Sequence, residues 1–327
     1  MSHPATFLHG ARTPWQILPN AVRDWITERT GPPTDAPVNC IGGMATGAAV
    51  IVPGTRRTLF AKAVDAVDNP RGAEMYLAEA EAAASLPRHR SIPELVETGL
   101  VQDDSEVNWR INLFPARPGA TPVHPWRADD LHLVLAEYAS LRPVLAATAW
   151  TQSADLSKML DGWERIAADP SDPWHPWAGE WSAREASMRA VVDGGAAAVL
   201  GHIDLRADNI LIAPETGQVS FLDWAHPATA APWADLALLL ADVVMSGASV
   251  EAGGEIDVVE LFARFEPDTD PELLIAAISS LAACLHARAH NEASRSGMPH
   301  RQRWSAAASQ QVVPFIRAHS RGSRDPQ

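Results

Sequence analysis

Cysteine is scarce in this sequence, and its scarcity excludes two kinds of protein. The chain of 327 residues contains only two cysteines, Cys40 and Cys284. They are too few and too far apart for a disulfide framework or for a zinc site made of four thiolates. We therefore expect a protein of the reducing cytosol, which predicts a cytoplasmic location.

The sequence also lacks the segments that carry a protein into or across a membrane. Its first ten residues show no basic region followed by an apolar stretch, so we expect no secretory signal. The most apolar segment, from Ala237 to Met245, is interrupted by Asp242 and is far shorter than a bilayer crossing requires. We therefore expect no membrane among the partners.

Basic residues are in the minority, and this bears on the remaining partners. The 40 acidic residues outnumber the 26 lysines and arginines, for a formal charge of -14. Nucleic acids recruit basic surfaces, so the charge balance argues against a nucleic-acid partner. A cationic small molecule would suit this charge better, although acidity also serves solubility alone.

The chain is long and apolar enough for about two lobes. Its hydrophobic content of 46% over 327 residues allows large buried cores. Apolar runs with glycines and polar turns predict strand hairpins within residues 39–65 and 95–114. Between these stretches, Asn69 and Pro70 open a helix that we expect to run to about Leu86.

Helical spacing dominates the second half of the chain, after a Pro- and Gly-rich boundary, PARPGATP, that follows Phe114. A further short helix is predicted near the N-terminus, with Asn20 as its cap and Gly31 as its stop. We predict an α+β fold with a sheet lobe and one key helix in residues 1–115, and a larger, mainly helical lobe in residues 116–327. The predicted helical segments there are 129–148, 182–194, 233–246, 256–265 and 271–291, with one hairpin at 209–224.

One polar loop carries the residues that phosphoryl transfer requires. The string HIDLRADN, residues 202–209, has the spacing H-x-D-x-x-x-x-N, and an apolar strand ends at a further acid, Asp223. Phosphoryl transfer needs a carboxylate near the attacking hydroxyl, oxygen ligands for Mg²⁺ and positive charge near the phosphates. We predict that Asp204 takes the hydroxyl proton, that Asn209 and Asp223 hold Mg²⁺, and that Arg206 offsets charge on the transferred group. His202 is expected to brace the loop. A metal-hydrolase site is excluded, because no second histidine lies at coordinating spacing.

A lysine and a glutamate in the first lobe are expected to pair at the nucleotide end of the site. Strand alternation places Lys62 on the same face as Phe60 and Val64, so its ammonium needs an anionic partner. Helical rotation places Glu79, unlike Glu74 and Glu81, on the apolar face of the next helix. We predict a Lys62–Glu79 ion pair that also contacts a nucleotide phosphate.

Two other segments complete the predicted nucleotide site. Gly42 and Gly43, with Gly47, are suited to a tight turn whose backbone amides approach phosphates. Asn112 to Phe114 should form a hinge that hydrogen-bonds the base through backbone groups. These patterns leave ATP and GTP as equal candidates for the phosphoryl donor.

The motifs resemble those of the aminoglycoside phosphotransferase and choline kinase branch of the protein-kinase-like superfamily. That family follows its H-x-D-x-x-x-x-N loop with an Asp-Trp dipeptide, matched here by Asp223-Trp224, and with an Asp-Leu-Ala helix start, matched by Asp235. The resemblance implies a bilobal protein-kinase-like fold and a kinase that uses Mg²⁺ with ATP or GTP. The family often has glycine after the histidine, where this sequence has Ile203, which should reshape the acceptor side.

The acceptor is expected to be a hydroxylated small molecule, an antibiotic or a related natural product, as in a resistance kinase. The alternative is a metabolic kinase for choline, homoserine or a sugar. A pseudokinase, which binds nucleotide without turnover, is disfavoured because Lys62, Asp204, Asn209 and Asp223 are all present. We expect a monomer or a homodimer.

Four tryptophans in residues 163–181 could serve either the acceptor or the core. Aromatic faces beside acids can hold a sugar or a cation, in a region where the family places acceptor-binding helices. Tryptophans also pack helices together, and we favour packing for most of them. The four are Trp163, Trp174, Trp177 and Trp181.

Overall fold

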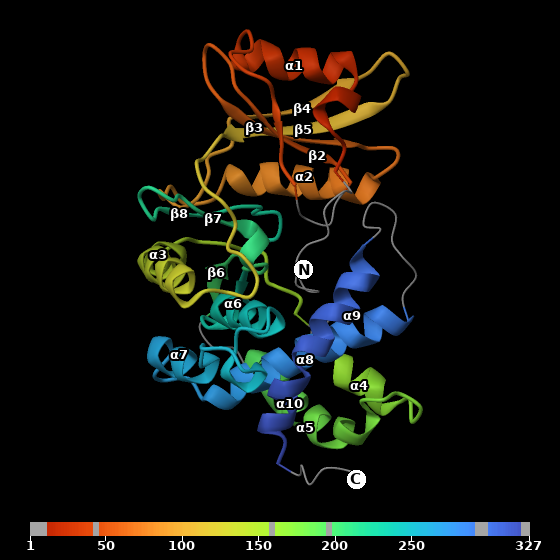
Figure 1. Cartoon of the computed structure of the whole chain (residues 1–327), viewed down its shortest axis with the longest axis vertical. Helices are drawn as coiled ribbons and strands as arrows, with labels where there is room; N and C mark the ends of the chain where they lie inside the picture. The colour runs from red at the N-terminus through yellow and green to blue at the C-terminus, as the bar shows by residue number, and fades with distance from the viewer. Residues whose placement is uncertain (1–11, 42–45, 157–160, 194–197, 292–299, 322–327) are drawn as a thin grey trace.

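A five-stranded antiparallel sheet forms the N-terminal lobe, in the order β1-β2-β3-β5-β4 (Figure 1). The computed structural model describes residues 12–41, 46–156, 161–193, 198–291 and 300–321. Strands that are consecutive in the sequence are neighbours in the sheet, except that α2 separates β3 from β4 in the chain and β4 joins the edge beyond β5. The strands are β1 Val38–Asn39, β2 Ala48–Val52, β3 Leu59–Asp65, β4 Glu97–Gln102 and β5 Asn108–Pro115.

Two helices cover the sheet, one on each face (Figure 1). Helix α1, Asn20–Thr30, packs Val22 and Ile26 into the core of this lobe. It begins one residue earlier than predicted, because Pro19 and not Asn20 occupies the cap position. Helix α2, Pro70–Ala83, begins as predicted, with the Asn69 side chain accepting a hydrogen bond from the Gly72 N–H at 2.9 Å.

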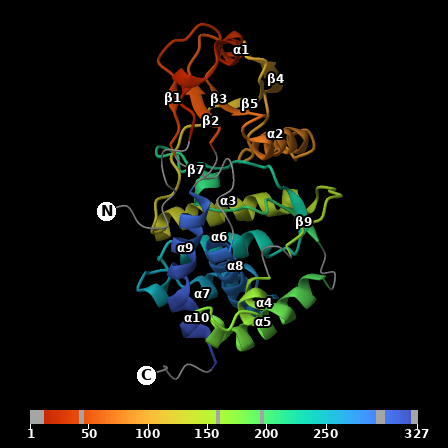
Figure 2. The ribbon, with the colours of Figure 1, turned by 90° about the vertical axis from the view of Figure 1, so that its right-hand side faces the viewer.

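The C-terminal lobe is mainly helical, and the predicted bilobal α+β fold is confirmed. Short strand pairs β6–β9 and β7–β8 lie on the side of this lobe nearer the sheet (Figures 1 and 2). Helices α4, α9 and α10 and the β6–β9 pair have sequence patterns from which they were not predicted. The helices are α3 Ala128–Ala146, α4 Gly162–Ala167, α5 His175–Asp193, α6 Ala234–Met245, α7 Val258–Phe265, α8 Pro271–Asn291, α9 Arg301–Gln311 and α10 Val313–His319. The strands are β6 Val199–Gly201, β7 Ile210–Ile212, β8 Val219–Phe221 and β9 Ala228–Ala230.

The chain segment before β4 packs onto the C-terminal lobe. Ile92 belongs to the hydrophobic cluster of that lobe, although it precedes two strands of the sheet. Beside it, Arg90 forms a bidentate ion pair with Glu137 of α3, with Nε 3.0 Å from Oε1. Arg117, in the connection after β5, donates to the carbonyl of Ile92 at 3.0 Å. These contacts tie the two lobes together at the back of their junction.

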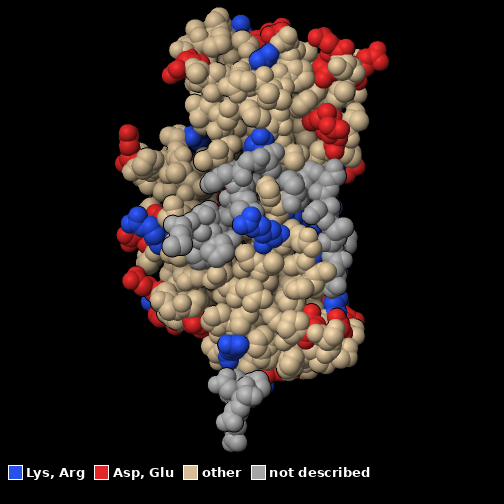
Figure 3. All heavy atoms as spheres, turned by 45° about the vertical axis from the view of Figure 1, so that its right-hand side comes forward, with Lys and Arg blue, Asp and Glu red and all other residues tan. Residues whose placement is uncertain are grey.

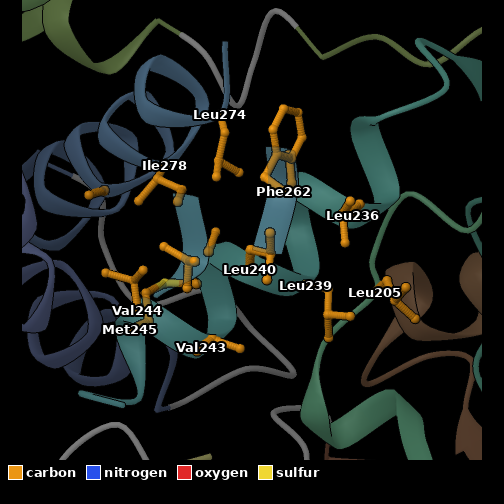
Figure 4. Close-up of a cluster of buried hydrophobic side chains, with 14 of the residues drawn as sticks. Leu205, Leu236, Leu239, Leu240, Val243, Val244, Met245, Phe262, Leu274 and Ile278 are labelled. Carbon is orange, nitrogen blue, oxygen red and sulfur yellow. The ribbon is translucent and has the colours of Figure 1, made fainter. Parts of the chain in front are cut away.

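Charged side chains lie scattered over the face of the molecule in Figure 3, with acidic groups mainly at its margins and some basic groups nearer its middle. Beneath the surface, α6 is the centre of the large core. Its residues are apolar on all sides apart from Asp235 and Asp242, which is typical of a fully buried helix. Figure 4 shows α6 side chains meeting Phe262 of α7 and Leu274 of α8, with Leu205 at the edge of the cluster.

Helix α8 is long and apolar enough to cross a membrane by length and composition alone. In the structure, 67% of its most apolar window is buried inside the protein. It packs against α4, α5, α6 and α9, which makes it a core helix of this lobe.

The tryptophans of residues 163–181 are mostly core residues. Trp163 and Trp181 stack with ring centroids 6.0 Å apart, and Trp174 stacks on His286 of α8 at 4.3 Å. All three are buried, so their faces are unavailable to a ligand. Helices α4 and α5 also lie at the end of the molecule far from the sheet (Figures 1 and 2). The packing interpretation therefore holds for these three tryptophans.

Candidate active site

Lys62 lies in the middle of β3 and is enclosed between two carboxylates. Its Nζ atom is 2.9 Å from Oε1 of Glu79 on α2 and 2.9 Å from Oδ1 of Asp223. The ion pair expected between Lys62 and Glu79 is therefore present. Burial alone would lower the pKa of Lys62, but Asp223 and Glu79 raise it, so the ammonium stays protonated. Burial raises the pKa of Glu79, whereas for Asp223 the attraction of Lys62 outweighs burial and lowers the pKa.

Asn112 occupies a different position from the one predicted. It lies inside β5, opposite Lys62 of β3 and Thr98 of β4, and is fully buried. Its amide nitrogen donates to Oε2 of Glu79 at 3.0 Å and to the carbonyl of Tyr76 at 2.7 Å. A central strand uses its backbone groups in the sheet, so Asn112 cannot offer them to a nucleotide base. Its side chain instead holds Glu79 toward Lys62.

Of the predicted hinge, Asn112 to Phe114, only Phe114 and the residues after it can offer backbone groups to a nucleotide base. Phe114 pairs with Phe60 of β3, but the ladder with β4 ends one residue earlier, at Leu113. From Phe114 onward, β5 is no longer paired with β4, so the backbone groups on that edge can hydrogen-bond to other partners. Of the predicted phosphate-loop glycines, Gly42 and Gly43 lie outside the described residues.

The loop after β6 is held from below by Asp235, at the start of α6. Its two carboxylate oxygens accept the backbone N–H groups of His202 at 2.7 Å and Ile203 at 2.8 Å. Ile203 adopts a φ of 61°, a left-handed conformation that is unfavourable for a β-branched residue. Leu205 is buried in the cluster of Figure 4. Asp204 is thus positioned between two anchored neighbours.

The carboxylate of Asp204 is both accessible and fixed in orientation. Its side chain is 42% exposed, and Nε of Arg206 lies 3.5 Å from Oδ1. Nδ2 of Asn209 donates to Oδ2 of Asp204 at 3.1 Å and to its backbone carbonyl at 2.8 Å. A group that accepts a proton from a bound hydroxyl needs this combination of access and fixed geometry.

Arg206 is engaged within the loop itself. Its Nε lies 2.8 Å from Oδ1 of Asp208, and its Nη2 donates to Oδ2 at 3.0 Å. Its guanidinium also lies over the ring of Trp304 on α9, 5.5 Å from the centroid. Burial raises the pKa of Asp208 to about 6, and Arg206 opposes this rise. Arg206 had been expected to neutralise charge on the transferred phosphoryl group. Because Asp208 already balances the charge of Arg206, this arginine is better placed to orient Asp204.

Asp223 follows β8 and is linked to the loop through its neighbours. Nε2 of His202 donates to the carbonyl of Leu222 at 2.7 Å, and the His202 ring packs on Trp224 at 4.5 Å. The N–H of Leu222 donates to the carbonyl of Asn209 at 2.7 Å. Asp223 itself has a φ of 60°, which is uncommon for a residue with a side chain. His202 therefore braces the loop, as predicted.

Two side chains supply oxygen atoms suited to Mg²⁺. The amide nitrogen of Asn209 bonds Asp204, which leaves its amide oxygen for another partner. Asp223 uses Oδ1 for Lys62, and its side chain is 39% exposed. Mg²⁺ is usually held by one or two such protein ligands together with substrate phosphates. The two residues therefore fit a nucleotide-bound Mg²⁺.

Asp242 supports the loop and was missed as a site residue. Its Oδ2 accepts the backbone N–H of Ala207 at 3.0 Å and the indole N–H of Trp126 at 2.9 Å. Burial would raise the pKa of Asp242, but contacts with His124, Trp126 and Ala207 lower it. The available signal was an acid inside an otherwise apolar helix, since such an acid needs buried donors.

Comparison with known proteins defines the class of this protein. No curated protein matches the chain. Three solved structures of low sequence identity share its fold. They are a microcompartment-associated aminopropanol kinase (13% identity, 91% of this chain and 98% of that chain, TM-score 0.55), the spectinomycin phosphotransferase APH(9)-Ia in complex with ADP and spectinomycin (12%, 92% and 99%, 0.53) and an ethanolamine kinase of Plasmodium vivax (10%, 86% and 84%, 0.51). The fold is therefore protein-kinase-like, as the resemblance implied.

The sequence itself places the chain more narrowly. The profile of the phosphotransferase enzyme family matches residues 45–270. The chain belongs to this family. It is a small-molecule phosphotransferase, and the resemblance recognised in its motifs is confirmed.

Proposed function

We propose that the protein transfers the terminal phosphoryl group of ATP or GTP to a hydroxyl of a small molecule. The proposal rests on two pairs of side chains that lie at the junction of the lobes, Lys62 with Asp223 and Asn209 with Asp204. Lys62 of the sheet contacts Asp223 of the second lobe at 2.9 Å, and Asn209 bonds the exposed carboxylate of Asp204 at 3.1 Å. A cation for phosphates, oxygens for a metal and a base for a hydroxyl are thus close together.

In this reaction, Asp204 accepts a hydrogen bond from the acceptor hydroxyl. As the hydroxyl oxygen bonds to the terminal phosphorus, its proton passes to Asp204 and the nucleoside diphosphate leaves. Lys62 contacts the phosphates, and Glu79 keeps its ammonium in place. Asn209 and Asp223 would hold Mg²⁺, which neutralises phosphate charge when bound.

We propose that the acceptor is an antibiotic or a related hydroxylated natural product. The net charge of -14 suits a cationic acceptor, and a structural neighbour is a spectinomycin phosphotransferase. On the face in Figure 3, basic groups lie scattered, unlike the basic stripe typical of nucleic-acid binding.

A metabolic kinase is the second candidate. The aminopropanol and ethanolamine kinases among the structural neighbours favour this alternative, since their named substrates are small amino alcohols. Choline, homoserine and sugars are the other acceptors that we consider for a metabolic kinase. Either candidate uses the same transfer chemistry, so the acceptor alone separates them.

A nucleotide-consumption screen tests the proposal directly. The purified protein is incubated with ATP or GTP, Mg²⁺ and a panel of antibiotics, amino alcohols and sugars, and phosphorylated products are identified by mass spectrometry. Consumption that depends on one acceptor and disappears in Asp204→Ala is the expected result. Acceptor-dependent consumption that persists in Asp204→Ala would refute the assigned base.

A salt series then determines the kind of acceptor. A polycationic acceptor held by carboxylates should show a Michaelis constant that rises steeply with ionic strength. An uncharged acceptor should show little change over the same range. A flat response for a cationic acceptor would contradict recognition through the acidity of the protein.

A further inference from the structure

Arg12 and Thr13, near the start of the described chain, are hydrogen-bonded to residues beside the nucleotide end of the site. The backbone N–H and the hydroxyl of Thr13 both donate to the carbonyl of Thr46, at 3.0 and 2.8 Å. Nη1 of the preceding residue, Arg12, lies 3.5 Å from the carbonyl of Gly47, its acceptor. These contacts place a guanidinium at the start of β2, one strand away from Lys62.

A tyrosine hydroxyl faces the same place without a partner. Tyr76 lies on α2, one turn before Glu79, and is 6% exposed. Its ring is 4.9 Å from Nζ of Lys62. Its hydroxyl is buried and makes no hydrogen bond within the described residues. A buried hydroxyl without a partner is costly, so a ligand that supplies an acceptor would satisfy it.

Gly47 leaves open the space between these two groups. A Cβ atom at this position would lie 3.1 Å from the Tyr76 hydroxyl and 2.8 Å from the carbonyl oxygen of Ala63. Glycine therefore permits the close approach of β2 to the Tyr76 hydroxyl. Burial raises the pKa of Tyr76, and the charges of Lys62 and Arg12 oppose that rise. Arg12 and Lys62 thus both lie close enough to Tyr76 for their charges to act on it.

The charges around Lys62 show what a nucleotide would need there. Glu79 and Asp223 are two carboxylates on the one ammonium of Lys62. A nucleoside triphosphate adds several negative charges, and Lys62 is the cation that the first lobe's predicted Lys62–Glu79 pair brings to its phosphates. A guanidinium offers a planar fork of N–H donors that suits phosphate oxygens. A phenol adds one more donor.

We propose that Arg12 and the Tyr76 hydroxyl bind phosphate oxygens of the donor nucleotide on the Gly47 side of Lys62. This subsite rests on the proposed function, because it requires a nucleotide in the cleft. It adds two phosphate contacts from outside the predicted motifs, one of them from the N-terminal segment.

Calorimetry with Mg²⁺ tests the subsite on the full chain. Arg12→Ala should weaken ATP or GTP binding about tenfold or more, as expected for charge-assisted hydrogen bonds, and Arg12→Lys should lose less. The matching nucleoside, which has no phosphate, should bind all variants equally in a competition assay. Arg57→Ala is the matched control, because Arg57 is exposed, lies in the turn from β2 to β3 at the opposite end of β2 from Gly47, and its side chain donates to the carbonyl of Arg29 at 3.2 Å.

Tyr76→Phe separates phosphate binding from a structural role. It removes only the hydroxyl, so nucleotide affinity should fall about threefold to tenfold while the melting temperature does not fall. Unchanged nucleotide affinity in Arg12→Ala and Tyr76→Phe would overturn the subsite. An equal loss for nucleotide and nucleoside would also overturn it, since that pattern reports a disturbed lobe.

The outcomes also separate the subsite from the proposed function. If the wild type binds nucleotide and only Asp223→Ala loses it, the proposed function stands and the subsite is wrong. If the wild type binds neither ATP nor GTP, the proposed function and the subsite both fail.

Discussion

Lys62 and Asp223 lie 161 positions apart in the sequence, and an ion pair of 2.9 Å joins their side chains across the two lobes. The Lys62 side chain is almost completely buried, whereas the Asp223 side chain remains 39% exposed. A bound nucleotide would need Asp223 for its metal and Lys62 for its phosphates. One contact between the lobes is therefore made by the two side chains that we assign to the phosphates and to the metal.

Asp223→Ala should remove the part of nucleotide binding that depends on Mg²⁺, because it deletes the carboxylate that we assign to the metal. Glu79→Ala should weaken binding by a smaller factor, since it only loosens Lys62. Calorimetry with and without Mg²⁺ measures both effects. Equal nucleotide affinity for wild type and Asp223→Ala in Mg²⁺ would rule out the metal assignment.

A covalent label offers an independent check on Lys62. The chain has only two lysines, Lys62 and Lys158, so a nucleotide analogue with an amine-reactive group should modify Lys62 in preference. Excess nucleotide should protect it, and peptide mass spectrometry identifies the modified residue. Labelling without protection would argue that Lys62 does not face the nucleotide.

Asp204→Asn should lower kcat by about a thousandfold, in the range typical of a lost general base, with nucleotide affinity within about twofold of wild type. The lost group serves the acceptor hydroxyl, which explains the unequal effects. Asp268→Asn is a suitable control because Asp268 is exposed. Wild-type turnover in Asp204→Asn would show that another group takes the proton.

Asn112→Ala should destabilise the protein by roughly 1 to 3 kcal/mol and raise the Michaelis constant for nucleotide. It leaves Oε2 of Glu79 without its donor in a buried position. Thr98→Val is the matched comparison, since the Thr98 hydroxyl donates to the amide oxygen of Asn112 at 2.8 Å and to the carbonyl of Ile111 at 3.2 Å, and its loss leaves the bond from Asn112 to Glu79 in place. Chemical denaturation and steady-state kinetics measure the two effects. A stable Asn112→Ala with unchanged nucleotide kinetics would contradict the supporting role.

Glu185 on α5 should make stability fall as pH rises through neutrality. It is 3% exposed, and burial raises its pKa from 4.5 to about 7. Between these values the folded protein binds more protons than the unfolded chain, so the free energy of unfolding falls with rising pH, by roughly 3 kcal/mol in all. Glu185→Gln should remove this slope, and the exposed Glu215→Gln should not. Urea unfolding at pH 5 and pH 8 compares them; parallel profiles for all three proteins would refute the shift.

Sequence patterns predicted the fold where local signals agreed with tertiary packing. Asn69 and Pro70 marked the start of α2, and strand alternation together with helical rotation identified the contact of Lys62 with Glu79. Helix α9 was missed because its pattern is polar and weakly amphipathic, and only the finished fold buries Trp304 and Ala308.

The candidate site was predictable where residues lie in one motif, as with Asp204 and Asn209. Contacts that depend on tertiary structure were not. Nothing local to Arg12 indicates that it will lie beside Gly47, and nothing local to Asn112 shows that the strand after it continues to Pro115. Such contacts follow from sheet register and chain path, which composition and spacing do not determine.

The left-handed backbone of Ile203 has a consequence for how new activities could arise on this scaffold. An isoleucine would leave that conformation if it were free, so two bonds to Asp235 and the burial of Leu205 keep the base in place before any substrate arrives. The nucleotide side is held by ion pairs between side chains from different elements, Lys62 with Glu79 and Asp223. Natural selection for a different acceptor would therefore act on the walls around Asp204 and leave the base itself unchanged.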